Sequence, residues 1–182
     1  MIEKIIEGFF KIAEIGDWDT FSIKEASNKL NIKEEELIKY VPSKEYFLIF
    51  YNDYVDKKVL ESISTEDIEN SNSDEVLQEY LMFKLEYMNK YKLAMTNIIN
   101  TSLINKKFII LSLKSNKESI KKFVNRIGEK QSYLKRKVLI KLTLILWMVA
   151  FNKWLYEDKK NETSYSLINK GIQRIKKNLK IF

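Results

Sequence analysis

Apolar residues recur along most of the chain at the three- and four-residue spacing of one face of an α-helix. In the first such segment, residues 2–15, the side chains of Ile5, Phe9 and Ala13 fall on one stripe. The later helical segments are predicted at residues 22–30, 33–40, 43–63, 75–90, 92–103, 106–127, 132–157 and 163–182. No segment has the alternation of a convincing strand, so the pattern predicts an all-α protein of about nine helices.

Local signals predict where several of these helices begin. Ser22 is followed three residues later by Glu25, which is a capping-box pattern for the second helix. Pro42 is expected at a helix start, where its missing N–H costs nothing, and Thr163 is expected to cap the last helix. The polar and acidic stretch 64–74 is the best loop candidate. One proline and four glycines in the whole chain favour long helices.

The segment 132–157 is the most apolar of the chain. Between Leu139 and Trp154 it is hydrophobic nearly all round, which predicts burial on two sides. Its longest apolar run, residues 142–151, is broken only by Thr143 and is shorter than the roughly 18 residues of a membrane span. The first residues carry no signal-peptide pattern. We therefore expect a buried helix in a cytoplasmic protein.

The net charge of +7 is unevenly distributed. Residues 1–60 hold 9 Lys and Arg against 12 Asp and Glu, and residues 61–102 hold 3 against 8. Residues 103–182 hold 20 against 5, so the positive charge that attracts phosphate lies in the C-terminal part. Either a solvated helix face or an anionic membrane surface would explain the basic run near the end. That run is Lys170, Arg174, Lys176, Lys177 and Lys180.

The composition also limits the chemistry that the protein can perform. Cysteine and histidine are both absent, which removes disulfides, thiol nucleophiles, histidine bases and nearly every transition-metal site. The carboxylates form no recognisable catalytic pair. We therefore expect a protein that is not an enzyme and that uses no metal or cofactor.

Three short helices followed by a proline and a longer helical body resemble the TetR family of transcriptional regulators. The resemblance rests on Ser22–Ala26, on the turn Asn31–Ile32 and on Leu37–Lys44, and it covers about residues 5–55. It implies a helix-turn-helix head over residues 1–45 and a helical ligand-binding and dimerisation body over residues 46–182. The implied function is a one-component regulator that binds operator DNA as a homodimer.

The resemblance implies that the head contacts double-stranded DNA through its second and third helices. The residues expected to meet DNA are Ser22, Lys24, Lys33, Glu34, Glu35, Lys39, Tyr40 and Lys44. The alternative is that they are ordinary solvated surface residues. If Leu37 faces the core, Glu36 lies at the edge of the buried face, and Glu34 and Glu35 remain the most exposed of the three glutamates. Carboxylates there stabilise the helix start but repel phosphate.

Two further sets of residues have roles implied by the same resemblance. A small apolar effector would be lined by Phe83, Tyr87, Met95, Trp147, Met148, Phe151 and Trp154. Plain core packing is the favoured explanation of these side chains. A two-fold interface would be formed by Leu139, Leu142, Leu146, Val149, Ile168, Ile172, Ile175 and Leu179. Burial within one subunit is the alternative for this second set.

A second function stays open. The C-terminal half is similar to a TetR-fold family of lipid-binding proteins in ubiquinone biosynthesis, through Tyr133-x-Lys135-Arg136 and Trp154-Leu155-x-x-Asp158. That resemblance implies a protein that binds an isoprenoid or another lipid and no longer binds DNA. The acidic N-terminal part favours this alternative, whereas the Pro42-Ser43-Lys44 block favours the regulator.

Overall fold

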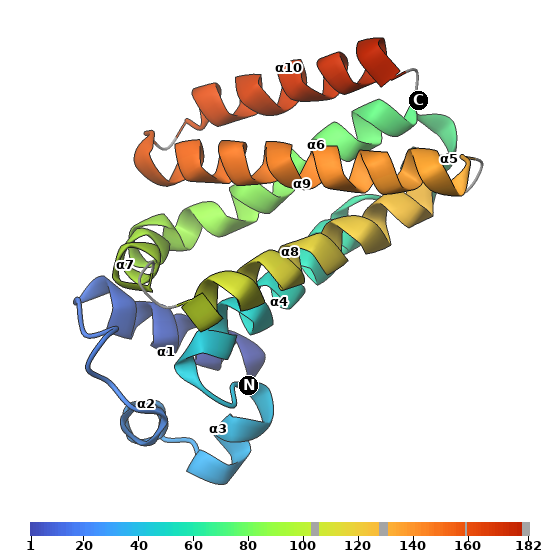
Figure 1. Cartoon of the computed structure of the whole chain (residues 1–182). Coiled ribbons are helices and arrows are strands. Elements are labelled where there is room, and N and C mark those ends of the chain that lie inside the picture. The colour runs from blue at the N-terminus through green and yellow to red at the C-terminus, as the bar shows by residue number, and fades with distance from the viewer. Residues whose placement is uncertain (103–105, 128–130, 159, 180–182) are drawn as a thin grey trace. The chain divides into compact units, whose positions relative to one another are not determined.

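The computed structural model describes residues 1–102, 106–127, 131–158 and 160–179 (Figure 1). These residues form ten α-helices and two single-turn 3-10 helices, and no strand occurs among them. The predicted all-α class is confirmed. The predicted count of nine is slightly low, because the acidic stretch expected as a loop contains the short helix α5 (Thr65–Asn70).

The chain folds into two compact units, of which the first contains residues 1–54 and 91–115. Its helices are α1 (Ile2–Glu14), α2 (Ile23–Leu30), α3 (Glu34–Tyr40), α7 (Lys92–Ser102) and the beginnings of α4 (Phe47–Ser62) and α8 (Lys106–Ile127). The 3-10 turn η1 (Lys44–Tyr46) precedes α4. Helix α1 packs against α2 and α7. Its aromatic core includes Phe9 stacked on Phe47, with ring centroids 4.7 Å apart.

The second unit contains residues 55–90 and 116–182. It is formed by the ends of α4 and α8 together with α5, α6 (Ser73–Met88), α9 (Tyr133–Tyr156) and α10 (Glu162–Leu179). The 3-10 turn η2 (Asn89–Tyr91) follows α6. Helix α10 runs beside α9 and also packs on α6 (Figure 1). The approach of α9 to α10 is close, because a Cβ on Gly171 would lie 2.3 Å from a methyl carbon of Leu146.

The predicted helix starts are confirmed in one case and wrong in two. The Ser22 hydroxyl accepts a hydrogen bond from the Glu25 N–H at 3.2 Å, and the Glu25 carboxylate accepts one from the Ser22 N–H at 2.6 Å. Both partners of the capping box are therefore present. The hydrogen bonds that the N–H and the hydroxyl of Ser22 donate to the Glu25 carboxylate lower the pKa of Glu25. Pro42 does not begin a helix, because it lies in the connection before η1.

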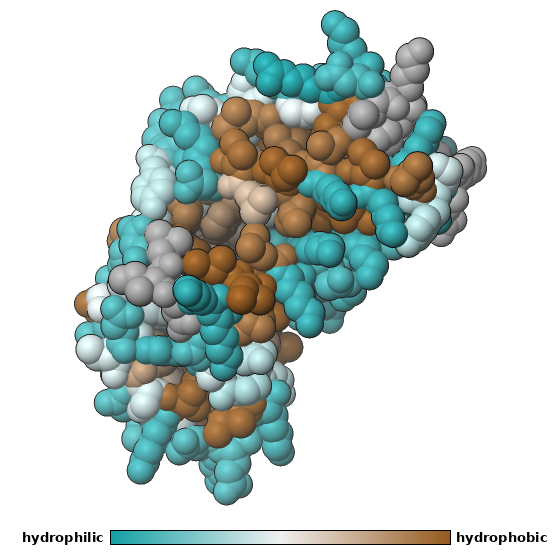
Figure 2. Space-filling model, in the orientation of Figure 1, coloured by the Kyte–Doolittle hydropathy of each residue, from teal (hydrophilic) through white to brown (hydrophobic). Residues whose placement is uncertain are grey.

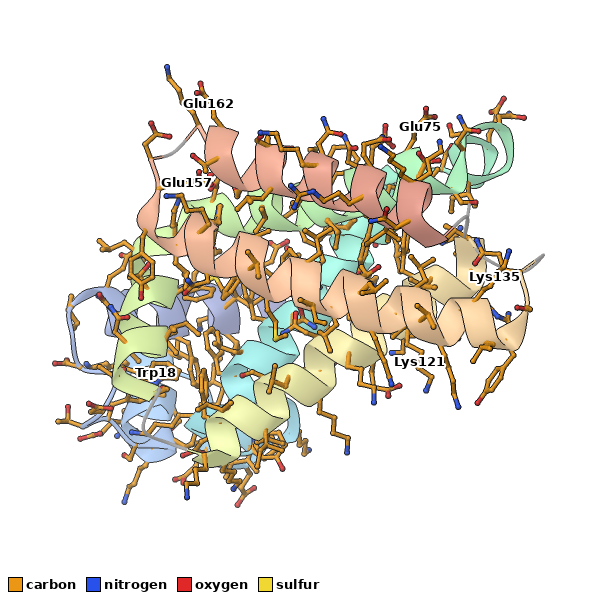
Figure 3. All side chains as sticks on the ribbon, turned by 45° about the horizontal axis from the view of Figure 1, so that its top comes forward. Trp18, Glu75, Lys121, Lys135, Glu157 and Glu162 are labelled. Carbon is orange, nitrogen blue, oxygen red and sulfur yellow. The ribbon has the colours of Figure 1, made fainter. Side chains whose placement is uncertain are left out.

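Thr163 does not cap α10, which begins one residue earlier at Glu162 (Figure 3). Instead the carboxylate of Glu157, at the end of α9, accepts hydrogen bonds from the backbone N–H groups of Thr163 and Ser164 at 3.0 and 3.1 Å. Asn161 reverses the chain between the two helices with a left-handed φ of 57°. The first N–H groups of α10 are therefore capped by Glu157, on the other side of the α9–α10 connection.

Helix α9 is covered by the rest of the chain on one side only. Leu139, Trp147 and Trp154 are buried, whereas Ile145 and Val149 are 53% and 51% exposed. Figure 2 shows the resulting apolar side chains gathered along α9. Two-sided burial is thus not reached within one chain. Among the described helices, α9 alone is long and apolar enough to cross a membrane. The core helix of a soluble protein passes the same test of length and composition, so this finding is weak evidence for a membrane span.

Candidate nucleic-acid interface

Helices α2 and α3 form a helix-turn-helix within the first unit. Helix α2 begins at the Ser22 capping box and ends at Asn31, whose left-handed backbone (φ 48°, ψ 54°) turns the chain. Asparagine tolerates this conformation better than most residues. Leu30, Ile32 and Leu37 are buried, so side chains from α2, the turn and α3 all anchor the motif to the core.

The orientation of α3 agrees with the one expected from Leu37. Leu37 is fully buried, Glu36 is half-buried, and Glu34 and Glu35 are exposed. The order of exposure predicted for the three glutamates is therefore confirmed. Tyr40, at the other end of α3, is 38% exposed and places its ring edge-on to Phe50, which leaves a mixed acidic, basic and aromatic surface.

Four of the other residues expected at DNA lie at two places. Lys33 immediately precedes α3 and Lys39 lies in its last turn, and both side chains are exposed. Ser22 and Lys24 lie at the start of α2 and are also exposed, but the Ser22 hydroxyl is engaged in the cap. Lys39 and the two exposed glutamates thus lie on α3, and Lys33 lies directly before it. Contact of these residues with DNA stays a prediction.

Lys44 has a role within the subunit that the sequence pattern does not reveal. Its ammonium donates hydrogen bonds to the carbonyl oxygens of Trp18 and Asp19 at 3.0 and 2.7 Å. It also lies 5.7 Å from the centre of the Phe21 ring. These contacts tie the α1–α2 connection to the start of α4. They use two of the three N–H donors of an ammonium, so a phosphate would have to share Lys44 with the loop.

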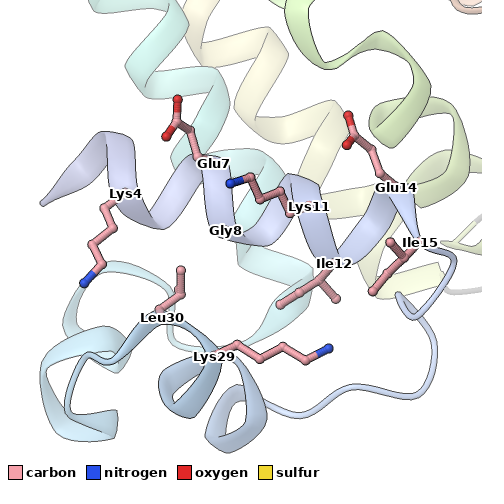
Figure 4. Close-up of a pocket in the computed structure, with 9 residues that line it drawn as sticks. All are labelled: Lys4, Glu7, Gly8, Lys11, Ile12, Glu14, Ile15, Lys29 and Leu30. Atoms are coloured by element: carbon pink, nitrogen blue, oxygen red, sulfur yellow. The ribbon is translucent and has the colours of Figure 1, made fainter.

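A surface groove lies between α1 and α2 (Figure 4). Its volume is about 580 Å³, and its lining includes Lys4, Lys11 and Lys29 as well as two glutamates. These opposite charges nearly cancel. Gly8 lies at its base, where a Cβ would be 1.9 Å from a methyl carbon of Leu30. The groove therefore follows from close helix packing and has no strong preference for an anion.

The aromatic residues expected around an effector are only partly brought together. Trp147, Phe151 and Trp154 follow one another on α9, with ring centroids 5.6 and 5.5 Å apart. The indole N–H of Trp147 donates to the Asn116 side-chain oxygen, and that of Trp154 donates to Asn89, each at 2.8 Å. Both tryptophans thus have the contacts of well-packed core residues.

The remaining effector candidates lie elsewhere. Met148 is 38% exposed on α9, and Phe83 is half-buried on α6. Tyr87 is 40% exposed, and its hydroxyl lies 2.7 Å from that of Ser62. Met95 is buried in the first unit, so it does not share a unit with the other six. Lining of an effector cavity by these residues stays a prediction.

The residues expected at a dimer interface fall into an inner and an outer group. Leu139, Ile168, Ile172 and Ile175 are buried within the subunit, which is their alternative role. Leu142 and Leu146 are half-buried, and Val149 is exposed. The side chain of Leu179 lies outside the described part of the chain.

Sequence reasoning missed a buried polar cluster in the second unit. Lys84 on α6 is 1% exposed, and its ammonium lies 2.7 Å from the Asp56 carboxylate of α4. It donates to the Ser119 hydroxyl of α8 at 3.0 Å and faces the rings of Tyr80 and Trp147 at 5.5 and 5.0 Å. The sequence does contain one indication of this cluster, because Lys84 lies on the same face of α6 as the buried apolar residues Leu77, Tyr80 and Leu81.

The hydrogen bonds of this cluster form a closed ring. Lys84 donates to Asp56 and to Ser119, Ser119 is 2.6 Å from the Tyr80 hydroxyl, and Tyr80 donates to Asp56 at 3.1 Å. If the Ser119 hydroxyl donates to Tyr80, every polar hydrogen of the two hydroxyls has an acceptor. Burial, followed by the neighbouring Asp56 charge, raises the pKa of Tyr80 well above its ordinary value.

Comparison with known proteins gives a clear result for the fold. A TetR transcriptional regulator from Nitrosomonas europaea ATCC 19718 has a similar structure, with a TM-score of 0.75 over 96% of this chain and 97% of that chain. The protein has a TetR-like fold. A TetR transcriptional regulator from Rhodococcus sp. RHA1 is similar with a TM-score of 0.62, over 97% of this chain and 94% of its own.

A third TetR-like neighbour is the fatty acid degradation regulator FadR from Bacillus halodurans. Its TM-score is 0.54, over 96% of this chain and 93% of its own. Sequence identity to the three structures is only 11, 11 and 12%, so they establish the fold alone. No protein-family model and no curated protein sequence matches the chain.

Proposed function

We propose that this TetR-like protein is a cytoplasmic one-component transcriptional regulator that binds operator DNA as a homodimer. The observation that carries the proposal is the anchored helix-turn-helix, in which buried Leu37 turns Lys39 and Tyr40 of α3 outward. Two such helices in a dimer would enter successive major grooves about 34–36 Å apart. A small apolar effector in the body would shift the population between binding and non-binding forms.

The exposed side of α9 supports the dimer. Its outward side chains Ile145, Met148 and Val149 recur at helical spacing and are 53, 38 and 51% exposed. A contiguous apolar stripe is costly in water and typical of an interaction surface. Helix α10 packs beside α9, so a second copy could cover both helices in the manner of a four-helix bundle. This partner would supply the second covered side that the sequence of α9 predicts.

DNA binding should be weak for sequences other than the operator. Glu34 and Glu35 are exposed at the start of α3, where they repel phosphate. Replacing them in a Glu34→Lys and Glu35→Gln variant should raise the affinity for random duplex DNA at least tenfold at low salt, about 1.4 kcal/mol. The matched control is Glu79→Lys with Glu86→Gln, which makes the same charge change on exposed positions of α6.

The experiment is a fluorescence-anisotropy titration of labelled duplex DNA, repeated over a range of salt concentrations. Lys39→Ala should weaken binding to all sequences and reduce the salt slope by about one unit, as expected for loss of one phosphate contact. Equal gains for the α3 variant and its α6 control would mean that net charge alone is responsible. In that case α3 is not the element that approaches DNA.

A lipid-binding protein is the second candidate, and two observations favour it. Residues 1–60 carry more acidic than basic residues, and the Lys44 ammonium is engaged by the carbonyl oxygens of Trp18 and Asp19. Mass spectrometry of lipids extracted from the purified protein tests this candidate. A bound isoprenoid together with no DNA binding at low salt would replace the regulator with this function.

A further inference from the structure

The second unit contains a strongly basic groove between the C-terminal half of α8 and the N-terminal half of α9. The groove has a volume of about 390 Å³, within the usual range of small-molecule sites. Its basic lining residues are Lys117, Lys121, Arg136, Lys137 and Lys141, and Glu118 is its one acidic lining residue. Side chains of α8 and α9 both contribute to the lining, and Figure 3 labels one of them, Lys121 of α8.

Few of these cations are neutralised within the subunit. Glu118 pairs with Lys121 at 3.1 Å, and Lys137 lies 4.5 Å from the centre of the Tyr133 ring. Lys117, Arg136 and Lys141 form no ion pair among the described residues. Arg136 is half-buried, so the residue has lost part of its water without an ion-pair partner among the described residues. An anionic ligand would supply the missing partner.

The position of these cations works against the stability of α9. Lys135, Arg136 and Lys137 lie in its first turns, and that end has no acidic residue. Positive charges at a helix N-terminus oppose the helix dipole. This placement of the basic lining residues therefore lowers the stability of α9 and favours binding of an anion. The polar surface of a helix needed only for solubility would not require this arrangement.

The groove also has an apolar part. Ile140 and Tyr133 belong to its lining, and Tyr133 and the adjacent Leu134 are 66 and 70% exposed. An inorganic ion would leave these side chains uncovered. We propose that the groove binds the phosphate group of an anionic ligand whose apolar portion lies against Tyr133. A guanidinium such as that of Arg136 can hold a phosphate with two parallel hydrogen bonds.

Phosphate of this kind could come from a soluble molecule or from a phospholipid headgroup, and the test separates the two. Binding of inorganic pyrophosphate is measured by calorimetry, and binding of phosphatidylglycerol vesicles is measured by co-sedimentation, with phosphatidylcholine vesicles as the neutral reference. The groove variant is Lys117→Gln with Arg136→Gln. The matched control is Lys170→Gln with Lys177→Gln on α10, which removes the same charge from exposed positions.

The groove variant should bind the probe at least tenfold more weakly, whereas the control should stay within twofold of the parent protein. If pyrophosphate binding is weakened by the groove variant and not by the control, the ligand is a soluble molecule. If vesicle binding is affected in this way, the ligand is a lipid headgroup. Equal losses in both variants, no binding of either probe, or groove-dependent binding of duplex DNA alone would overturn the proposal. If the Arg136→Gln chain does not fold, Arg136→Lys keeps the charge, and it should still weaken binding by loss of the two-pronged contact.

Discussion

Replacing Asp56 with alanine would leave the ammonium of Lys84 buried without its ion-pair partner. Loss of one member of a buried pair costs about 3–5 kcal/mol, because the remaining charge has neither water nor a counterion. Here the Ser119 hydrogen bond and the rings of Tyr80 and Trp147 remain, so we expect the lower end, about 3 kcal/mol. For a chain of this length, that corresponds to a fall in Tm of about 6–12 °C.

The assay is urea unfolding at one fixed protein concentration, because oligomerisation changes apparent stability. Lys84→Met should cost less than Asp56→Ala, since the Asp56 side chain is 16% exposed and can regain water. The double variant should then be more stable than the sum of the two single effects by about 1–3 kcal/mol. An exposed pair, Lys58–Glu61, is the control, and Glu61→Ala should cost less than about 1 kcal/mol. If Asp56→Ala costs no more than Glu61→Ala, the ammonium is not dependent on its partner and the reasoning is wrong.

Three further changes test other parts of the structure. Ser22→Ala should destabilise the protein by about 1 kcal/mol through loss of the α2 cap, while Ser71→Ala, with no cap to lose, should change the unfolding midpoint little. The raised pKa of Tyr80 means that above pH 10 the unfolded chain releases a proton that the folded chain keeps, so stability falls as pH rises. Tyr80→Phe should make this alkaline loss shallower by up to about 1.4 kcal/mol per pH unit in urea titrations, and an unchanged slope would contradict the shift. Val149→Glu should convert the dimer to monomer in light scattering while Lys57→Glu does not, and a parent protein that is already monomeric at micromolar concentration would exclude the proposed interface.

Features that depend on neighbouring residues in the sequence could be predicted well. The capping box needs only Ser22 and Glu25, three residues apart, and both of its hydrogen bonds are present. The exposure of Glu34 and Glu35 follows from one buried residue, Leu37, and the angle between successive helical residues. Both predictions required no knowledge of what lies across the core.

Features that depend on distant partners could not be predicted in the same way. Lysine is usually a surface residue. The burial of Lys84 requires the carboxylate of Asp56, which is distant in the sequence, as an ion-pair partner. The cap of α10 comes from Glu157 across a reversal at Asn161, so the nearby Thr163 was a misleading signal. For α9, periodicity revealed two apolar sides but could not say whether the same chain covers both.

The three tryptophans give the protein a built-in optical reporter for each compact unit. Trp18, labelled in Figure 3, belongs to the first unit. Its indole N–H donates to the Ser102 hydroxyl at 3.1 Å. Trp147 and Trp154 belong to the second, and Trp147 has the Lys84 ammonium over its ring. Indole fluorescence responds to hydration and to nearby charge, so a Trp18→Phe chain would report on the second unit alone. Comparison of its denaturation curve with that of the parent would reveal, without any added label, whether the two units lose their structure in one step or in succession.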